Sequence, residues 1–577
     1  PEDLDERWWM ISYIPEHALE SVRAAEIELG SGLSVDKAWR TTTGAWDVVV
    51  AVGDSGIEWD ERSLVNKVHL NVNELPAPWT VNAAGETVET TCASSVSRTE
   101  CFDLDGNGLV NLQDYALDSR VLIDAGVAVS DNMLDPSDLI YTFSDGVDDD
   151  GNGYVDDIAG WDFFADDNDP YATLDSGYGT HGTDVMQDIG SEGEDGGMIG
   201  VCPNCAVLPV RVGDTFVVDG TRVAQGIAFA ADSGARVMNL SVGALSDPDL
   251  TGQAVAYARE KNMVLVGAAG DENAYHHNMP ALHADFLYVH SVHYDTASRN
   301  DDVYSYMNFF NCNNYGPRMD LVSGSEACAT GAAANTSAVA GLVLSVSDEL
   351  GLDLDVDEVR QVLVSSVDDV WLSDEELDEA GTYPSSEGWD PFYGYGRLNA
   401  AKAVEAVAGG DIPPVARIVA PRWFETLDPD RKGKLELEVE ARADRVGDFT
   451  WELAWSQGWE PSSWTVVDAG AGTEALLAQT IEFDLSEVDV SPVPEAELME
   501  GVVERVERTH APALNFRLRV VDGEGRLGES RRTIFVNRDP DMLSGFPLNL
   551  KGSGESSPIL SDLDGDGVFE IVLATAS

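Results

Sequence analysis

The chain has 577 residues, and its 34 basic side chains stand against 104 acidic ones, which gives a net charge of −70. The apolar share of 44% is enough for packed cores, so the composition excludes a wholly disordered chain. The length indicates roughly three or four domains. A surface this acidic repels nucleic acid and anionic membranes, and neither is expected as a partner. No run of about 18 apolar residues is present, so no transmembrane segment is predicted.

Residues 1–30 form a lead-in with a helical-looking middle, and the sequence does not indicate its role. An apolar run then starts at Trp46 and ends in a polar turn, which is typical of a buried parallel strand. Strand-like and helix-like segments alternate after it, at 206–212, 223–234, 235–243, 251–262 and 263–270. This alternation predicts an α/β domain whose parallel sheet carries helices on both faces.

The six cysteines fall into three close pairs, Cys92 with Cys101, Cys202 with Cys205, and Cys312 with Cys328. Close pairing favours disulfides and an oxidising compartment, so we expect an extracellular or cell-surface protein. The alternative for the Cys202 pair is a redox or zinc half-site. No second C-x-x-C and no histidine pair accompanies it, which makes that alternative the weaker one.

An insertion at residues 92–145 contains a strong match to a calcium loop, which runs D-L-D-G-N-G-L-V-N-L-Q-D. Its first, third, fifth, ninth and twelfth positions are Asp103, Asp105, Asn107, Asn111 and Asp114, and Gly108 takes the sixth. The loop resembles those of EF-hand or dockerin modules. Residues 133–143 look like the exit helix of a second hand whose loop has lost its ligands.

A second carboxylate-rich loop follows the insertion. Asp148, Asp150 and Asn152 sit at alternate positions with a glycine after them, and Asp157 lies close behind. Alternation points successive oxygens at one hard cation, so calcium is the expected cofactor here as well.

The pattern changes near residue 411. Alternating apolar and polar segments over 411–540 predict an antiparallel sandwich that resembles immunoglobulin or fibronectin domains. Residues 541–577 resemble the opening of an FG-GAP repeat, a calcium-binding propeller blade, and its expected ligands are Asp562, Asp564, Asp566 and Glu570. One blade cannot bury its own faces, so we expect the natural protein to be longer than this chain.

Two short motifs relate residues 31–410 to the subtilisin-like serine proteases. A-V-G-D-S-G-I resembles that family's aspartate motif, and G-T-H-G-T resembles its histidine motif. The resemblance implies that Asp54 orients and charge-stabilises His181, which would act as a general base. It also implies that the strand end at Leu240, Ser241, Val242 and Gly243 lines a substrate cleft.

The rest of the family's constellation departs from its pattern. The oxyanion donor of the family is an asparagine in A-A-G-N, and this chain has Asp271 there. An ionised carboxylate donates no proton and repels a developing oxyanion, so catalysis is expected to suffer by roughly 3 kcal/mol or more.

The nucleophile has two possible alignments within C-A-T-G-A-A-A-N-T-S-A-V-A-G. Matching Thr330 to the family's threonine leaves Gly331 where the serine belongs. Matching N-T-S makes Ser337 the nucleophile, although it then stands about one helical turn too close to V-A-G. The spacing does not decide between them.

Two functions follow from these alignments. A vacant position at Gly331 predicts a calcium-stiffened, catalytically silent or impaired scaffold that binds a polypeptide or a surface protein. A serine at 337 predicts an active secreted endopeptidase with an Asp54, His181 and Ser337 triad. A Ser337 hydroxyl within hydrogen-bond reach of His181 Nε2 would support the endopeptidase, and Gly331 facing His181 would support the scaffold.

Overall fold

The protein is described here by a computed structural model of all 577 residues. The residues that it describes are 8–13, 32–59, 61–82, 84–124, 132–172, 178–193, 198–244, 246–295, 305–309, 312–371, 385–459, 461, 463–488, 512–538, 545–546, 548 and 559–573. The predicted helix in the N-terminal lead-in lies outside these residues.

A ten-stranded sheet forms the centre of the larger domain, in the order β13-β14-β12-β10-β9-β7-β1-β5-β4 with β11 beside β10. Apart from β11 and β13, the neighbouring strands run parallel. Its strands are β1 Val49–Asp54, β4 Trp161–Asp162, β5 Ala206–Arg211, β7 Val237–Leu240, β9 Val264–Ala268, β10 Phe286–Asp295, β11 Ser305–Phe309, β12 Leu321–Gly324, β13 Val367–Asp368 and β14 Arg397–Leu398. The predicted parallel sheet is confirmed.

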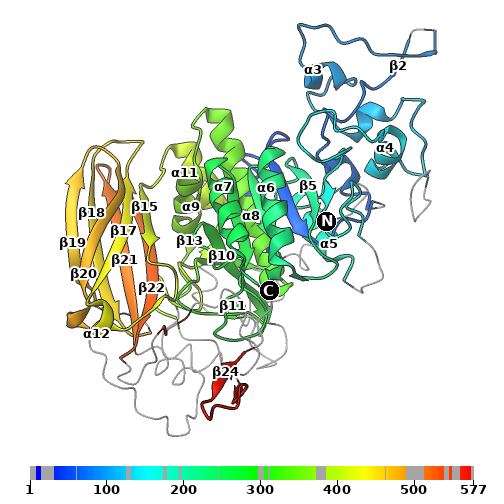
Figure 1. Cartoon of the computed structure of the whole chain (residues 1–577). Helices are drawn as coiled ribbons and strands as arrows, with labels where there is room; N and C mark the ends of the chain where they lie inside the picture. Colours follow the sequence, from blue (N-terminus) through cyan, green and yellow to red (C-terminus); the bar gives the residue numbers. More distant parts are fainter. Residues whose placement is uncertain are drawn as a thin grey trace.

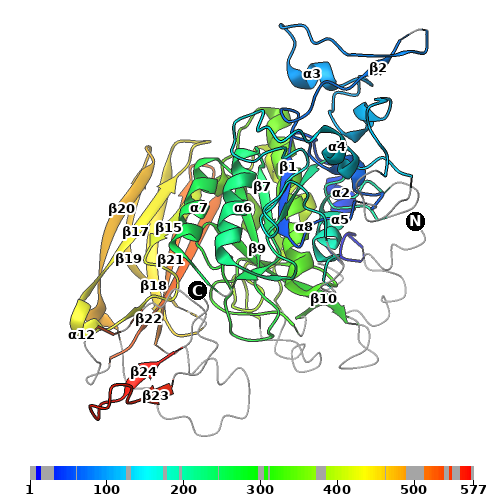
Figure 2. The ribbon, with the colours of Figure 1, turned by 45° about the vertical axis from the view of Figure 1, so that its right-hand side comes forward.

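Helices cover both faces of the sheet, as Figure 2 shows for β1, β7 and β9. Val50 and Val52 of β1 share a core with α5, α8, α9 and α11, whereas Val49 and Ala51 pack into a second core with α6 and α7. This alternation follows from the two-residue period of a strand, and both faces are apolar because both are covered. The helices are α2 Val35–Ala38, α5 His181–Gly190, α6 Gly220–Asp232, α7 Asp249–Glu260, α8 Cys328–Leu350, α9 Val356–Ser365 and α11 Ala400–Gly409, with a short helix η2 at Val65–Lys67.

Helix α8 is the central element of this domain. Its apolar stretch is long and hydrophobic enough for a membrane span, but 94% of that stretch is buried inside the domain, so the core accounts for its composition. The sequence search for uninterrupted apolar runs overlooked it because serines and an asparagine interrupt the run. Alanines and glycines dominate its first half, and their small size lets the neighbouring α5 and β10 approach closely.

The insertion stands apart from the sheet, with β2, α3 and α4 projecting together from the domain (Figure 1). Its elements are β2 Thr80–Val81, β3 Thr87–Val88, α3 Arg98–Phe102, η3 Leu112–Tyr115 and α4 Pro136–Phe143. The predicted exit helix is α4. It begins with a capping box between Asp135 and Asp138 and has a proline in its first turn.

All three predicted disulfides are present, and no described cysteine is free. The Cys202–Cys205 bridge is fully buried between Gly44 and Gly341. A Cβ on Gly44 would lie 2.4 Å from the Cys202 sulfur, and its φ of +101° also favours glycine. The Cys312–Cys328 bridge joins the first residue of α8 to the loop before β12.

Two further sheets follow α11 and share one apolar core (Figure 1). One has the order β15-β17-β20 and the other β16-β22-β21-β18-β19, and only the β16–β22 pair is parallel. Their elements are β15 Val415–Ala420, β16 Thr426–Leu427, α12 Pro429–Lys432, β17 Lys434–Arg442, β18 Phe449–Gln457, β19 Thr465–Gly472, β20 Leu476–Asp484, η6 Leu485–Glu487, β21 Ala513–Asp522 and β22 Leu527–Val536. The likeness to immunoglobulin or fibronectin domains stays a prediction.

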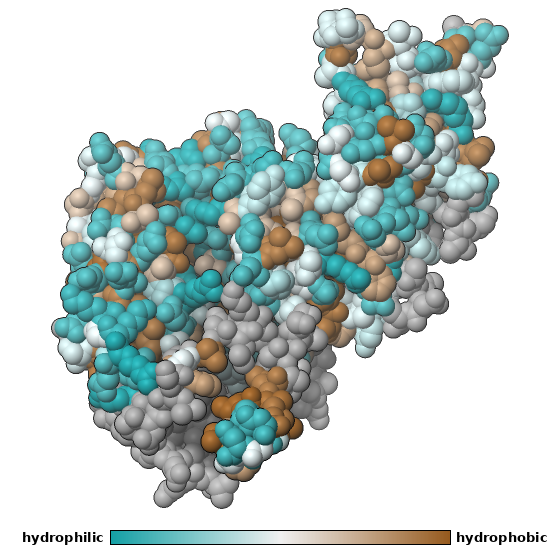
Figure 3. All heavy atoms as spheres, in the orientation of Figure 1, coloured by the Kyte–Doolittle hydropathy of each residue, from teal (hydrophilic) through white to brown (hydrophobic). Residues whose placement is uncertain are grey.

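Near the end of the chain, β23 Ile559–Ser561 and β24 Glu570–Val572 form an antiparallel hairpin. Apolar side chains gather beside it in the space-filling view of Figure 3. Ile559, Leu563 and Phe569 are each 65–68% exposed. A full propeller blade would cover such side chains, and the propeller assignment stays a prediction.

The glycine beside the buried disulfide gives a test of this packing. We expect Gly44→Ala to lower the free energy of unfolding by about 1–2 kcal/mol for the backbone and about 1–3 kcal/mol more for overpacking against the Cys202 sulfur. Gly85→Ala is the matched control, because Gly85 also has a positive φ of +79° but open space around it. Denaturant midpoints measure both changes, and equal losses would contradict the packing described here.

Candidate active site and cation clusters

Asp54 and His181 meet at the carboxyl end of the parallel sheet. Asp54 is the last residue of β1 and is fully buried, and His181 is the first residue of α5. Asp54 Oδ1 lies 2.7 Å from His181 Nδ1 and accepts a hydrogen bond of 2.7 Å from the Ser55 backbone N–H. This contact fixes the ring and leaves Nε2 to face the cleft.

Hydrogen bonds from Ser55 also fix the backbone on both sides of His181. Ser55 Oγ accepts from the Gly182 N–H at 3.0 Å and donates to the Gly179 carbonyl at 3.2 Å. A Cβ on Gly182 would lie 2.3 Å from the Gly56 carbonyl oxygen, so only glycine allows β1 and α5 to approach this closely. The glycines of both motifs therefore serve the contact between Asp54 and His181.

Charge around His181 shifts its titration. Burial alone would lower the pKa of His181, but the charge and hydrogen bond of Asp54, helped by Asp184 and Asp271, raise that pKa above its ordinary value. The protonated ring is thus stabilised in the folded protein. A general base in this position would also hold the proton that it accepts more firmly.

The hydroxyl that faces His181 Nε2 belongs to Thr330, at 3.4 Å. Thr330 lies in the first turn of α8, which begins at Cys328, and it is partly exposed. Sequence reasoning matched Thr330 to the family's threonine and missed it as the group against the histidine. The start of α8 decides this placement, and the sequence motif does not show where the helix begins.

The two predicted nucleophile positions do not face the histidine in this structure. Ser337 is fully buried two turns further along α8, and its hydroxyl donates to Asn239 Oδ1 at 3.0 Å. A Cβ on Gly331 would lie 2.2 Å from Ser325 Oγ, so that position points at Ser325 and has no space for a serine. In this structure neither Ser337 nor Gly331 faces His181, and the hydroxyl nearest to the histidine is that of Thr330.

Ser337 instead begins a buried hydrogen-bond chain beneath the site. Asn239 Nδ2 donates to Ser241 Oγ at 3.0 Å, and Ser241 Oγ donates to the Thr330 carbonyl at 3.0 Å. Each member satisfies a polar group that would otherwise be buried without a partner. The chain links the middle of α8, the end of β7 and the residue that faces His181.

Asp271 follows β9 and reaches the N-terminus of α8, where its Oδ1 accepts from the Ala329 backbone N–H at 3.0 Å. Loss of hydration raises the pKa of Asp271, while this N–H and His181 act against the rise. The carboxyl group of Asp271 therefore occupies the N-terminal end of α8, where the helix would otherwise attract anions.

The predicted cleft strand is partly covered. Leu240 ends β7 and is fully buried, and Ser241 and Val242 are buried after it. Gly243 belongs to β8 (Gly243–Ala244), which pairs with β6 (Val217–Val218), and its N–H donates to the Phe216 carbonyl at 2.8 Å. Part of the edge that would hold an extended peptide is thus already paired.

Three groups of carboxylates could each hold one cation, and each includes residues of a predicted calcium loop. Their members are Asp103, Asp105 and Asp114 in the first, Glu74, Asp150 and Asp157 in the second, and Asp562, Asp564 and Asp566 in the third. In each group one oxygen from every residue lies within 4.8 Å of the others. Oxygen donors at this density suit calcium.

The remaining predicted ligands lie close by but in other roles. Asn111 caps η3, Asn107 and Asn152 donate to the neighbouring aspartates, Asp148 accepts from backbone N–H groups of its own loop, and Glu570 accepts from the Leu563 N–H. Glu74 was missed because it lies far from its loop in the sequence. Burial raises the pKa of Asp157 to about 7; hydrogen bonds from Asn71 and Asn152 oppose the rise, and the charges of Asp150 and Glu74 add to it.

The contact between Asp54 and His181 predicts a pH dependence. Asp54→Asn should lower the pKa of His181, because burial remains and the raising charge is gone. A raised folded pKa stabilises fully below the unfolded value of about 6.5, and this contribution disappears as the pH rises through the folded pKa. The stability advantage of the unmodified protein over Asp54→Asn should therefore shrink with rising pH.

NMR titration of histidine Cε1 signals and denaturant midpoints between about pH 5.5 and 8.5 measure both effects. Asp430→Asn, on the surface of the second domain, is the control and should leave His181 unchanged. An unaltered His181 pKa in Asp54→Asn would contradict this electrostatic account.

Removal of calcium tests the carboxylate groups. A site filled at about 100 times its dissociation constant stabilises by about 2.7 kcal/mol, so chelation should lower the melting temperature and speed proteolysis between residues 92 and 181. Glu74→Gln should reduce this calcium response. Asp149→Asn, whose carboxylate lies outside the group in the same loop, should keep it, and an unchanged melting curve in excess chelator would exclude a structural calcium ion.

Comparison with known proteins shows which family the sequence of this chain matches. The subtilase family matches residues 46–396, more than half of the chain. Thermitase from Thermoactinomyces vulgaris is 28% identical over 257 residues, which cover 43% of this chain and 81% of thermitase. The halolysin-like extracellular serine protease Nep from Natrialba magadii is 28% identical over 261 residues, 42% of each chain.

Among solved structures, a protease from Pseudoalteromonas arctica is 22% identical with a TM-score of 0.37, covering 65% of this chain and 94% of that one. The family match spans the segments that carry Asp54, His181, Asp271 and Thr330. The chain belongs to the subtilase family.

Proposed function

We propose that this protein is an extracellular, calcium-stabilised subtilase whose peptidase activity is silent or strongly impaired, and whose cleft binds polypeptide. One observation carries the proposal. The group against His181 Nε2 is the Thr330 hydroxyl, at 3.4 Å, and the carboxylate of Asp271 lies on the N-terminus of the same helix.

Thr330 is a poor substitute for a serine in this geometry. Its hydroxyl lies beyond the usual hydrogen-bond reach of about 2.6–3.2 Å between a nucleophile and its base. Proton transfer to His181 is therefore weakened at the first step.

Asp271 impairs the second step. A tetrahedral intermediate needs neutral donors at its oxyanion, and removal of one such donor costs roughly 10²–10³ in rate. Asp271 offers an ionised oxygen instead, and it also occupies the Ala329 N–H. The two defects act on one coupled unit, so repair of either alone restores little.

A binding role fits what remains. The strand end beyond β7 reaches the surface at Gly243, which is half-buried, and extended peptides bind to strand edges by strand addition. Tyr178 and Phe216 stack edge to face beside His181 and give the cleft an aromatic wall. The expected partner is an extended segment of a polypeptide or of a surface protein.

Three observations support an extracellular, calcium-containing environment: the disulfides, the acidic surface, and the extracellular location given in the name of one relative. Three disulfides persist in oxidising compartments. The relative Nep is described as extracellular. Calcium at the three carboxylate groups would neutralise part of a charge of −70, since the carboxylates would supply the oxygen ligands and the cation the positive charge.

The same contact supports a second candidate, a peptidase that uses Thr330 as its nucleophile. His181 would accept the Thr330 proton, and protonated Asp271 would donate to the oxyanion. The raised pKa of Asp271 favours this role, whereas its exposure opposes it.

Restoration of the site tests the proposal. We expect no labelling of the unmodified protein by a fluorophosphonate and negligible casein hydrolysis. The double variant Thr330→Ser with Asp271→Asn should label at position 330 and gain at least about 100-fold in hydrolysis, because it regains a serine hydroxyl and a neutral donor. Each single variant should stay well below the double variant.

Ser337→Ala in the restored background is the matched control and should keep the gain in activity, since Ser337 contacts Asn239 rather than His181. Labelling of the unmodified protein at Thr330, abolished by Thr330→Ala, would establish the second candidate. Labelling at Ser337 would overturn the placement of α8.

A further inference from the structure

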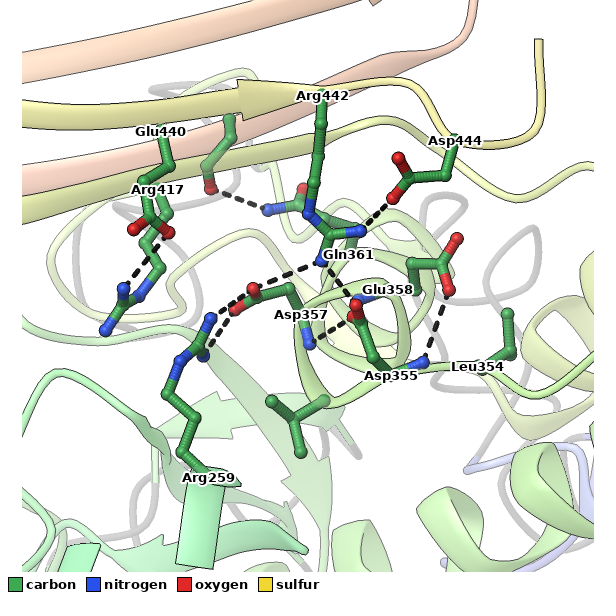
Figure 4. Close-up of polar contacts among 12 residues, drawn as sticks. Arg259, Leu354, Asp355, Asp357, Glu358, Gln361, Arg417, Glu440, Arg442 and Asp444 are labelled. Carbon is green, nitrogen blue, oxygen red and sulfur yellow. Dashed lines mark hydrogen bonds and ion pairs between the residues drawn. The ribbon is translucent and has the colours of Figure 1, made fainter. Parts of the chain in front are cut away.

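The contact between the subtilase domain and the following sheets gathers arginines in a chain that has few. A cavity there is lined by Arg259, Arg318, Arg360, Arg417, Arg531 and Arg532, together with Asp285 and Asp357. The first three arginines come from the subtilase domain, and the last three come from β15 and β22. Figure 4 shows Arg259 and Arg417 among the ion pairs around Asp357.

Most of these guanidinium groups have a carboxylate partner. Arg259 binds Asp357 and Asp285, Arg417 binds Asp285 and Glu440, and Arg318 and Arg360 share Asp320. These pairs are cross-linked: Asp285 contacts both Arg259 and Arg417, and Arg442 and Arg445 of the second domain bind Asp355, Asp357 and Glu358 of the first. Arg531 binds Glu529, so five of the six arginines have a carboxylate partner.

Arg532 is the exception. It is 3% exposed, and among the described residues no carboxylate forms an ion pair with it. One of its terminal nitrogens donates to the Ile418 carbonyl, and its guanidinium lies 4.9 Å from the Trp423 ring. Its Nε, like the Nε of the equally buried Arg318, has no hydrogen-bond partner.

The surroundings make this charge costly. Burial, followed by the charges of Arg318 and Arg417, lowers the pKa of Arg532 to about 9. Breaking or omitting one partner of a buried ion pair leaves a charge that destabilises the fold. The Trp423 ring offsets part of this cost, because the guanidinium groups of Arg532 and Arg318 both lie over it, at 4.9 and 5.2 Å. An aromatic ring, however, carries no charge that would neutralise an arginine.

The cavity has space for a neutralising group. Its volume is about 40 Å³, which is enough for a few water molecules or one small anion. Planar guanidinium groups match the oxygens of a tetrahedral anion, and burial strengthens such contacts. A protein partner is too large for this space.

We propose that this cavity binds one small inorganic oxyanion of the sulfate or phosphate type, which neutralises Arg532 and joins the two domains. The anion would accept hydrogen bonds from the unpartnered Nε groups of Arg532 and Arg318. It would contact residues of both domains at once, so its binding would stabilise their contact.

Sulfate titration of the full chain tests the proposal. Protein freed of sulfate and phosphate is melted in about 0–20 mM sodium sulfate at constant ionic strength set with sodium chloride, a range in which general salting-out effects are small. The melting temperature should rise with the logarithm of the sulfate concentration above the dissociation constant. Calorimetric titration should give one site, and a parallel series with phosphate shows which oxyanion binds more tightly.

Arg532→Met should weaken sulfate binding by about 10- to 100-fold, the equivalent of one charge-assisted hydrogen bond. Without sulfate it should melt no lower than a variant that loses a surface arginine, because it removes an unpaired buried charge. Arg519→Met is that control, since Arg519 lies on the neighbouring strand β21, pairs with Glu529 and is 40% exposed in its side chain. It should keep the full sulfate response.

Three results would overturn the proposal. The first is a melting temperature that ignores sulfate and phosphate at constant ionic strength, with no calorimetric binding. The second is an equal response to added chloride alone, and the third is an unchanged sulfate response in Arg532→Met. If Arg532→Met does not fold, calorimetry on the unmodified protein and on Arg532→Lys, which keeps the charge and loses the planar group, decides the outcome.

Discussion

The packing of α8 against the central sheet is the constraint on which the rest of the subtilase domain depends. Alanines and glycines line the half of the helix that approaches β10 and α5, and any larger side chain there would separate the layers. This close approach brings the N-terminus of α8 to the edge where β1, β7 and β9 end. Ser241 and Asp271 bond to the helix at that edge, and Asp54 holds His181 beside it.

The same packing explains why hydroxyl groups along one helix have different roles. Thr330 in the first turn reaches the histidine, whereas Ser337 lies too deep and satisfies Asn239. A polar group buried at this depth requires a partner, and the chain through Ser241 supplies it. The site is therefore built from a structural network as well as from the residues that face the cleft.

The strong negative charge imposes a second organisation. With 34 basic residues against 104 acidic ones, most carboxylates must remain in water or share a cation. The three carboxylate groups that could hold a cation gather some of them, and the domain contact gathers arginines around Asp285, Asp320 and Asp357. Charge is thus concentrated at two kinds of place. One is the acidic loops, which could bind a metal cation, and the other is the domain contact, where arginine side chains pair with carboxylates.

The sequence predicted those features that depend on local pattern. The apolar run of β1, the glycines beside His181 and the loop from Asp103 to Asp114 each need only neighbouring residues to be recognised. Glu74 and the arginine cavity depend on residues that are far apart in the sequence, and no local spacing indicates them. Thr330 was missed for a different reason, because spacing to V-A-G cannot reveal how many turns of helix precede it.

Gly331 limits which substitutions could place a serine at this site. Because Ser325 fills the space that a side chain there would need, a serine cannot return at that position without displacing its neighbour. Threonine and serine codons differ by a single nucleotide, as do those of aspartate and asparagine. One nucleotide change at Thr330 and one at Asp271 would therefore supply the serine hydroxyl and the neutral donor that the proposed function lacks, with no change at Gly331.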